Sequence, residues 1–173
     1  QACHYCDFHF STTMGKKEAM VSALCRELEL RKEEFSNVVV ETIYFGGGTP
    51  SVLETEEIEQ LIYAVREHYD IVDKPEITLE ANPDDLSEEK ILQLADSPIN
   101  RLSIGIQSFF EEDLKLMNRA HNALEAEKSL LLASEHFDNI SIDLIYGMPN
   151  MTLEHWKQNI DKALGFGIPH ISS

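Results

Sequence analysis

Apolar residues recur along this chain at two spacings that alternate from one segment to the next. Segments with an apolar residue every three or four positions predict amphipathic helices at 16–33, from 55, from 87, at 122–135 and from 152. Short runs rich in β-branched and aromatic residues predict strands at 38–45, 76–81, 101–109 and 139–146, with another beginning at 170. Because strands and helices alternate, we expect parallel strands joined by right-handed crossovers.

Polar residues stand where four of these helices should begin. A short oxygen-bearing side chain can accept a hydrogen bond from the first helical turn, and Asn122 with Glu125 has the spacing of a capping box. The predicted capping residues are Thr55, Ser87, Asn122 and Thr152. Gly165 is expected to end the last helix.

The central strands have one apolar face and one small or polar face, because successive side chains point to opposite sides. The apolar face, expected to pack under helices, carries Ile77, Leu79, Leu102, Ile104, Ile106, Ile140, Ile142 and Leu144. The other face carries Thr78, Glu80, Ser103, Gly105, Gln107, Ser141 and Asp143. A doubly wound sheet is covered on both faces and is apolar throughout. The pattern therefore favours a curved, partial barrel with a ligand in its interior.

Composition narrows the class of protein. The 173 residues are 43% hydrophobic and 26% charged, which suits one globular domain. A net charge of −17 repels nucleic acid and anionic membrane surfaces, so neither is an expected partner. No apolar run reaches the roughly 18 residues needed to span a bilayer, and the start lacks signal-peptide features. We expect a cytoplasmic protein without an integral membrane segment.

The cysteines divide into a pair and a single residue. Cys3 and Cys6 form a Cys-x-x-Cys pair, which occurs in iron–sulfur, zinc and dithiol sites. Three cysteines in a chain of this length do not suggest a disulfide framework, so reduced or metal-bound thiols are expected. Cys25 lies at helical spacing from Val21 and Leu28 and is assigned to the core.

Polar positions also lie at the predicted carboxyl ends of separate strands, where barrel enzymes carry their chemistry. They are Gly46, Gly47, Gly48 and Thr49 after the first strand, and Glu80, Gln107 and Asp143 on later strands. Any one of them could be an ordinary core or turn residue. Burying so many polar groups without partners would cost roughly 1–3 kcal/mol each, so together they predict a binding site.

Four motifs in order make the chain resemble the radical S-adenosylmethionine (SAM) superfamily over its whole length. They are the cysteine pair, Gly46-Gly47-Gly48-Thr49-Pro50, the stretch 102–109 (LSIGIQSF) and the stretch 143–149 (DLIYGMP). More narrowly, the chain resembles the oxygen-independent coproporphyrinogen III oxidase-like group. The resemblance implies that residues 1–173 belong to a radical SAM core domain. Its fold would be α/β, a partial (β/α)6 TIM-like barrel that lacks the first strand.

The resemblance also implies a cofactor site. Cys3 and Cys6 match the second and third cysteines of a Cys-x-x-x-Cys-x-x-Cys motif whose thiolates hold a 4Fe-4S cluster, and the first cysteine is expected before Gln1. The implied SAM contacts are Tyr5 at the adenine, Gly46, Gly47, Gly48, Thr49 and Glu80 at the methionyl amino end, Arg119 at the carboxylate, and Gln107 and Asp143 at the ribose. From sequence alone, Arg119 could equally be a solvated residue near a helix end.

The implied chemistry is electron transfer from the reduced cluster into the sulfonium of SAM, which yields methionine and a 5′-deoxyadenosyl radical. Phe8 stands where dehydrogenases of the group usually carry a further cysteine, and Cys6-Asp7-Phe8 matches the HemW branch, associated with heme binding and delivery. We therefore expect a HemW-like protein, with heme or another tetrapyrrole and an electron-donor protein as partners. The runner-up is a coproporphyrinogen III dehydrogenase that makes protoporphyrinogen IX, so enzymatic activity stays open.

Two other classes remain. Cys3 and Cys6 could form a zinc or dithiol module with His4 or His9. The barrel mouth could bind a tetrapyrrole without catalysis, the cluster being structural. His121 and His155 could ligate heme, although histidines at helix starts are more often surface residues.

The chain opens inside the expected cluster loop and stops as a sixth strand of the barrel begins. We therefore expect it to be a fragment truncated at both ends. Two cysteines cannot supply three thiolates, so residues 1–173 alone are expected to hold no intact cluster and to be inactive.

Overall fold

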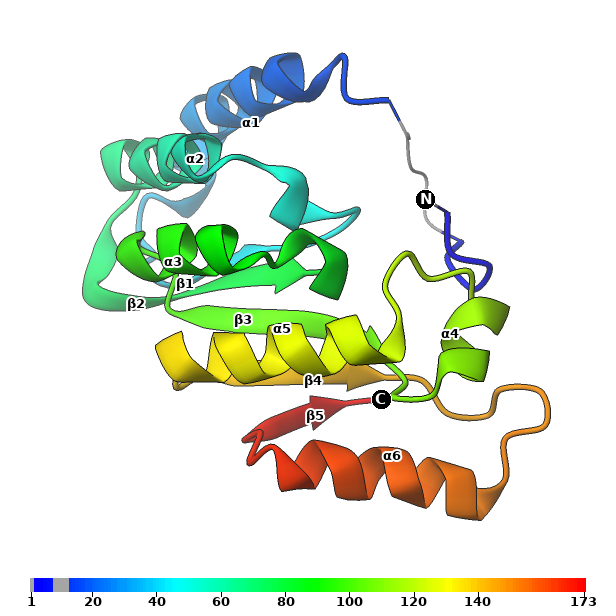
Figure 1. Ribbon diagram of the computed structural model, residues 1–173. Coiled ribbons are helices and arrows are strands. Elements are labelled where there is room, and N and C mark those ends of the chain that lie inside the picture. Colours follow the sequence, from blue (N-terminus) through cyan, green and yellow to red (C-terminus); the bar gives the residue numbers. More distant parts are fainter. Residues whose placement is uncertain (1, 8–12) are drawn as a thin grey trace.

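The strands form an open sheet whose order in space is their order in sequence (Figure 1). The computed structural model describes residues 2–7 and 13–173. Within these residues there is one five-stranded sheet, ordered β1-β2-β3-β4-β5, with every neighbouring pair parallel. The strands are β1 (Val40–Phe45), β2 (Ile71–Ala81), β3 (Arg101–Gln107), β4 (Ile140–Leu144) and β5 (His170–Ser172). A doubly wound sheet would reverse its strand order at a switch point. The predicted α/β fold with a partial barrel is confirmed.

The helices connect these strands and are close to the predicted segments. They are α1 (Lys17–Arg31), α2 (Thr55–His68), α3 (Glu88–Asp96), α4 (Glu111–Leu116), α5 (Ala123–His136) and α6 (Leu153–Gly165). Short 3₁₀ helices lie at Lys32–Phe35, Pro50–Val52 and Pro83–Asp85. The short α4 was not predicted. Among the described residues, none of the helices is both long and apolar enough to cross a membrane.

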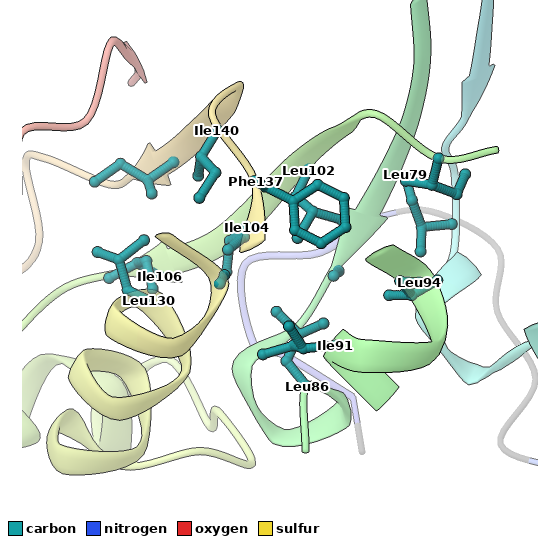
Figure 2. Packing of buried hydrophobic residues seen from close by; sticks show 14 of the residues in the cluster. Leu79, Leu86, Ile91, Leu94, Leu102, Ile104, Ile106, Leu130, Phe137 and Ile140 are labelled. Carbon is teal, nitrogen blue, oxygen red and sulfur yellow. The ribbon is translucent and has the colours of Figure 1, made fainter. Parts of the chain in front are cut away.

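The hydrophobic core lies between the sheet and the helices on one of its faces. The predicted apolar strand residues are buried and form one cluster with residues of α2, α3, α5 and α6. Figure 2 shows Ile91 and Leu94 of α3 and Leu130 of α5 packed against the strands. At about 25 cal/mol per Å² of buried apolar area, this cluster supplies the main stabilisation of the sheet. The prediction that this face packs under helices is confirmed.

Three of the four predicted helix caps are confirmed. Ser87, Asn122 and Thr152 each accept a hydrogen bond from a backbone N–H in the first turn, and Glu125 completes a capping box with Asn122. The prediction for Thr55 was wrong, because the helix begins one residue earlier than a Thr55 cap requires and Glu54 occupies the N-cap position. The backbone N–H of Glu54 donates to Oε2 of Glu57 at 2.8 Å.

At the end of α6, Gly165 is the last helical residue, as expected. The left-handed backbone that turns the chain back toward β5 is at Gly167, with φ 71°.

The first helix packs on α2 and contributes little to the central core. Val21 is buried, whereas Cys25 is half-buried and packs against the edge of the cluster. The assignment of Cys25 to the core therefore holds only in part.

Candidate functional site

The carboxyl ends of the strands face the amino-terminal segment and α4 (Figure 1). The backbone N–H of His4 donates to the carbonyl of Met117 at 3.0 Å, and the side-chain amide of Asn118 donates to the carbonyl of Ala2 at 2.7 Å. Segments more than one hundred residues apart in sequence are thereby joined at the mouth of the partial barrel.

The glycine-rich turn directly after β1 is shaped by close contacts. A Cβ at Gly46 would lie 2.7 Å from a ring carbon of Tyr44 and 3.1 Å from Oε1 of Glu80, so any larger residue here would displace the Tyr44 ring. Gly47 has φ 109°, and its N–H donates to Oε2 of Glu80 at 3.1 Å. The segment around Gly48 and Thr49 is partly exposed. The turn thus presents exposed main chain at the barrel mouth, with Tyr44 and Glu80 against one side of it.

Glu80 is held by two donors from β1 and the turn after it. Besides Gly47, the hydroxyl of Tyr44 donates to Oε1 of Glu80 at 2.8 Å. Burial and this hydrogen bond raise the pKa of Tyr44 above its usual range. The carboxylate of Glu80 therefore has a fixed orientation beside the glycine turn, where it can bind a cationic group.

Asp143 belongs to the same electrostatic environment. Burial raises the pKa of Asp143, the hydroxyl of Ser172 lowers it, and the nearby charge of Glu80 raises it again. The hydroxyls of Ser141 and Ser103, on the same sheet face, lie 3.0 Å apart. The carboxylates of Glu80 and Asp143 lie on the same sheet face. Because a carboxylate attracts a cation and accepts hydrogen bonds from hydroxyl groups, together they suit a ligand that carries both.

Gln107 ends β3 with an unusual backbone. Its φ is 66°, in the left-handed region that residues other than glycine rarely adopt. Its side chain is buried and crosses over Gly105, where a Cβ would lie 2.8 Å from Nε2 of Gln107. The same imaginary Cβ would lie 3.5 Å from Nη2 of Arg119. Gln107 and Arg119 are therefore neighbours, and Gly105 leaves the space for both.

Arg119 connects the cysteine segment to the strand ends. Its Nη2 donates to Oδ1 of Asn82 at 2.7 Å and to the carbonyl of Gly105 at 2.9 Å. Its Nη1 lies 3.1 Å from the hydroxyl of Tyr5 and 3.5 Å from Sγ of Cys3. The interpretation of Arg119 as solvated surface is wrong, because its guanidinium is half-buried among site residues.

Tyr5 and the two cysteines lie on one tight turn. The N–H of Cys6 donates to the carbonyl of Cys3 at 3.2 Å, and both thiols are free and half-buried. Desolvation raises the pKa of Tyr5 to about 12, against the lowering effect of the Arg119 charge. The guanidinium of Arg119 therefore lies beside both the thiol of Cys3 and the hydroxyl of Tyr5.

The zinc alternative depends on a third ligand. Nδ1 of His4 faces the carbonyl of Leu116 at 3.1 Å, and His9 lies outside the described residues, as does Phe8. Among the described residues, no three His, Cys, Asp or Glu side chains are grouped to hold a metal ion.

The structure thus brings the predicted residues together in two groups. The first comprises Gly46, Gly47, Glu80 and Asp143, and the second comprises Cys3, Tyr5, Gln107 and Arg119. These groups have the chemistry that SAM beside an iron–sulfur cluster would need. Gly46 leaves the space that a Cβ would fill, the carboxylate of Glu80 is held by two donors, and the guanidinium of Arg119 lies beside the thiol of Cys3.

Sequence reasoning missed Tyr44 and Asn82 of this site, and it placed Ser103 only on the polar face of the sheet. Tyr44, Ser103 and Asn82 each carried a signal, because they share a strand face with Glu80 or follow the end of β2 directly. The expectation that His121 is a surface residue was wrong, since it is 2% exposed.

His121 is buried because its polar atoms have partners. Nε2 faces the carbonyl of Ile106 at 3.2 Å, and Nδ1 lies 3.5 Å from Nη2 of Arg119. A hydrogen bond with His121 lowers the pKa of Asp84. His155, also expected at the surface, keeps 16% of its side chain exposed.

Comparison with known proteins gives consistent matches. A family model described as the radical SAM superfamily matches residues 1–163. The heme chaperone HemW of Lactococcus lactis is 40% identical over 172 residues, covering 98% of this chain and 44% of the relative. HemW of Bacillus subtilis is 36% identical over 173 residues, with 98% and 46% covered. The chain spans less than half the length of these relatives.

Solved structures extend the comparison. Coproporphyrinogen III oxidase (HemN) from Escherichia coli, a radical SAM enzyme, superposes with a TM-score of 0.87 at 27% identity, covering 99% of this chain and 41% of that one. Elp3 from Methanocaldococcus infernus, at 22% identity and a TM-score of 0.64, shares the fold.

Proposed function

Because the chain belongs to the radical SAM superfamily, we propose that its strand ends bind SAM beside a 4Fe-4S cluster in a protein of the HemW type. The observation that carries this proposal is the position of Arg119. Its guanidinium contacts Cys3 and Tyr5 on one side and the ends of β2 and β3 on the other. Because the cationic Arg119 lies beside the thiol of Cys3 at the barrel mouth, a cluster bound by the cysteines would be next to an anionic group of the ligand held by Arg119.

Each side chain then has a binding role. The carboxylate of Glu80, oriented by Tyr44 and Gly47, accepts hydrogen bonds from the methionyl ammonium. Arg119 pairs with the methionyl carboxylate, for which a planar guanidinium is well shaped. Asp143 accepts hydrogen bonds from the ribose hydroxyls, and the amide of Gln107 forms hydrogen bonds with them as well. Tyr5 lies against the adenine. The bound cluster and SAM supply electron transfer and radical chemistry, while the protein orients them and excludes water.

The cluster needs three thiolates, and Cys3 and Cys6 provide two. We propose that the third comes from a cysteine preceding Gln1 in the native protein.

Heme and an electron-donor protein are the further partners that we propose for this protein, and the cytoplasm is its proposed location. The HemW relatives support heme as the cargo, since they are heme chaperones by name.

Coproporphyrinogen dehydrogenation is the second candidate, because the HemN structure superposes over nearly the whole chain. Phe8 in place of a further cysteine favours the HemW type.

Anaerobic reconstitution of the native protein that contains this sequence tests the proposal. We expect bound iron and sulfide, a visible absorbance band typical of a cluster, and SAM binding that Glu80→Gln weakens. Stoichiometric zinc in place of iron would support the zinc module. Heme binding without release of protoporphyrinogen supports the HemW type, whereas conversion of coproporphyrinogen III would establish the dehydrogenase. A cluster that never cleaves SAM when reduced would indicate a noncatalytic tetrapyrrole-binding domain.

A further inference from the structure

Gln107 is held in a strained turn. The N–H of Ser108 donates to the carbonyl of Ile106 at 2.8 Å, across Gln107 with its φ of 66°. This is a γ-turn of the rare type with positive φ, which persists only where the surroundings enforce it. On the other side, the N–H of Ile145 donates to the carbonyl of Gln107 at 2.9 Å.

The residue that enforces this turn is Asn159 of α6, which lies fifty residues after Phe109 in sequence. Asn159 has no exposed surface, and its Oδ1 accepts a 2.8 Å hydrogen bond from the N–H of Phe109. Its Nδ2 lies 3.2 Å from Oγ of Ser108. The hydroxyl of Ser108 in turn donates to Oδ2 of Asp113 at 2.6 Å.

The location of Asn159 in its helix is unusual. It lies three residues after Trp156 and four before Ala163, on the stripe of α6 that packs against the core. An apolar residue would be expected there, because burying an amide is unfavourable unless each of its groups is hydrogen-bonded. Here both amide groups are used, and both act on the two residues that follow Gln107.

We propose that Asn159 is a positioning residue for SAM: through Ser108 and Phe109 it fixes the turn that directs Gln107 toward the ribose. This inference rests on the proposed function, since it takes Gln107 as a ribose contact. Asn159 itself does not touch the ligand. Its removal should weaken SAM binding by loosening Gln107 and should leave the cysteine segment unaffected.

A role confined to stability predicts something different. If Asn159 only attaches α6 to the sheet, its loss lowers the melting temperature and leaves the SAM affinity of the folded protein unchanged. Asn100 provides the control for losing an amide with both groups hydrogen-bonded: its amide binds the N–H of Ile77 and the carbonyl of Pro75, both at 2.8 Å, although its side chain is more exposed than that of Asn159. Those groups lie near the amino end of β3, away from the site.

The experiment measures SAM dissociation constants in the native, cluster-loaded protein. Asn159→Ala and Gln107→Ala should each raise the dissociation constant about two- to tenfold, the value of one hydrogen bond. The double variant should be no weaker than the worse single variant, because both act through one contact. Ser108→Ala, a smaller change, should act in the same direction. Asn100→Ala should leave the dissociation constant unchanged, and the affinity for methionine, which has no ribose, should be unchanged in Asn159→Ala.

The outcomes separate two failures. If the native protein binds no SAM, the proposed function fails and the inference with it. If Gln107→Ala weakens binding but folded Asn159→Ala and Ser108→Ala do not, the inference alone is overturned. Additive losses in the double variant, or an equal loss of methionine affinity, would also overturn it.

Discussion

The hydroxyl of Tyr44 donates a 2.8 Å hydrogen bond to Oε1 of Glu80 on the neighbouring strand. Parallel pairing sets Tyr44 opposite Thr78, so its side chain lies on the same sheet face as Glu80, two residues further along β2. The other carboxylate oxygen of Glu80 accepts the N–H of Gly47 at 3.1 Å. Strand β1 and the turn after it thus fix both oxygens of the acid proposed to bind the methionyl ammonium.

We predict that Tyr44→Phe weakens SAM binding about two- to tenfold, because Glu80 loses one of its two orienting donors. The fold should be little affected, since the side chain of Tyr44 is 58% exposed. Equilibrium binding to the cluster-loaded protein measures the effect. Tyr63→Phe, at a 67% exposed tyrosine on α2, is the control and should bind SAM normally. Equal affinity in both variants would contradict an orienting role for Tyr44.

Gly46→Ala should disturb the hydrogen bond between Tyr44 and Glu80 by displacing the Tyr44 ring. The new methyl group would lie 2.7 Å from the ring of Tyr44, which has to turn away and lose its hydrogen bond to Glu80. We expect a loss of about 0.5–1.5 kcal/mol in the free energy of unfolding, measured by chemical denaturation. Gly48→Ala is the matched control for stability, because nothing lies within 4 Å of its Cβ. Equal destabilisation by the two substitutions would argue against the contact.

Asp143 makes stability depend on pH. Burial and the charge of Glu80 raise the pKa of Asp143 in the folded protein above its unfolded value of 3.8. The folded state therefore binds more protons in that range, and the contribution of Asp143 to stability is present below pH 3.8 and lost as the pH rises through the raised pKa. We predict that Asp143→Asn is more stable than the parent at neutral pH. Denaturation curves at neutral and acidic pH should show the difference disappearing in acid.

The fold follows largely from local sequence. Alternation along the strands separated the core face from the polar face, and short polar residues such as Ser87 and Thr152 marked helix starts correctly. The cap at Thr55 was misjudged because Glu54 and Glu57 form a competing reciprocal pair, which residue preference alone does not reveal. Helix α4 was missed because it is only six residues long and begins without a side-chain cap.

The sequence predicted which residues form the site but not which side chains contact one another there. Strand alternation and position placed Glu80, Gln107 and Asp143 at one mouth. The contact of Arg119 with Tyr5 spans 114 residues, and only the return of the chain through α4 creates it. Likewise, the buried amide of Asn159 has no local signal, because its partners lie on a different element.

Arg119→Lys tests whether the fork shape of the guanidinium, and not only its charge, organises the site. A lysine keeps the charge but cannot reach Asn82, Gly105 and Tyr5 together, as the two terminal nitrogens of Arg119 do. We predict that SAM binds roughly tenfold more weakly, the lower end for a hydrogen bond to a charged group. Arg26→Lys, in an exposed pair with Glu29 on α1, is the control and should bind normally. Since a point charge would suffice for long-range attraction alone, full affinity in Arg119→Lys would show that the bridging geometry has no part in binding.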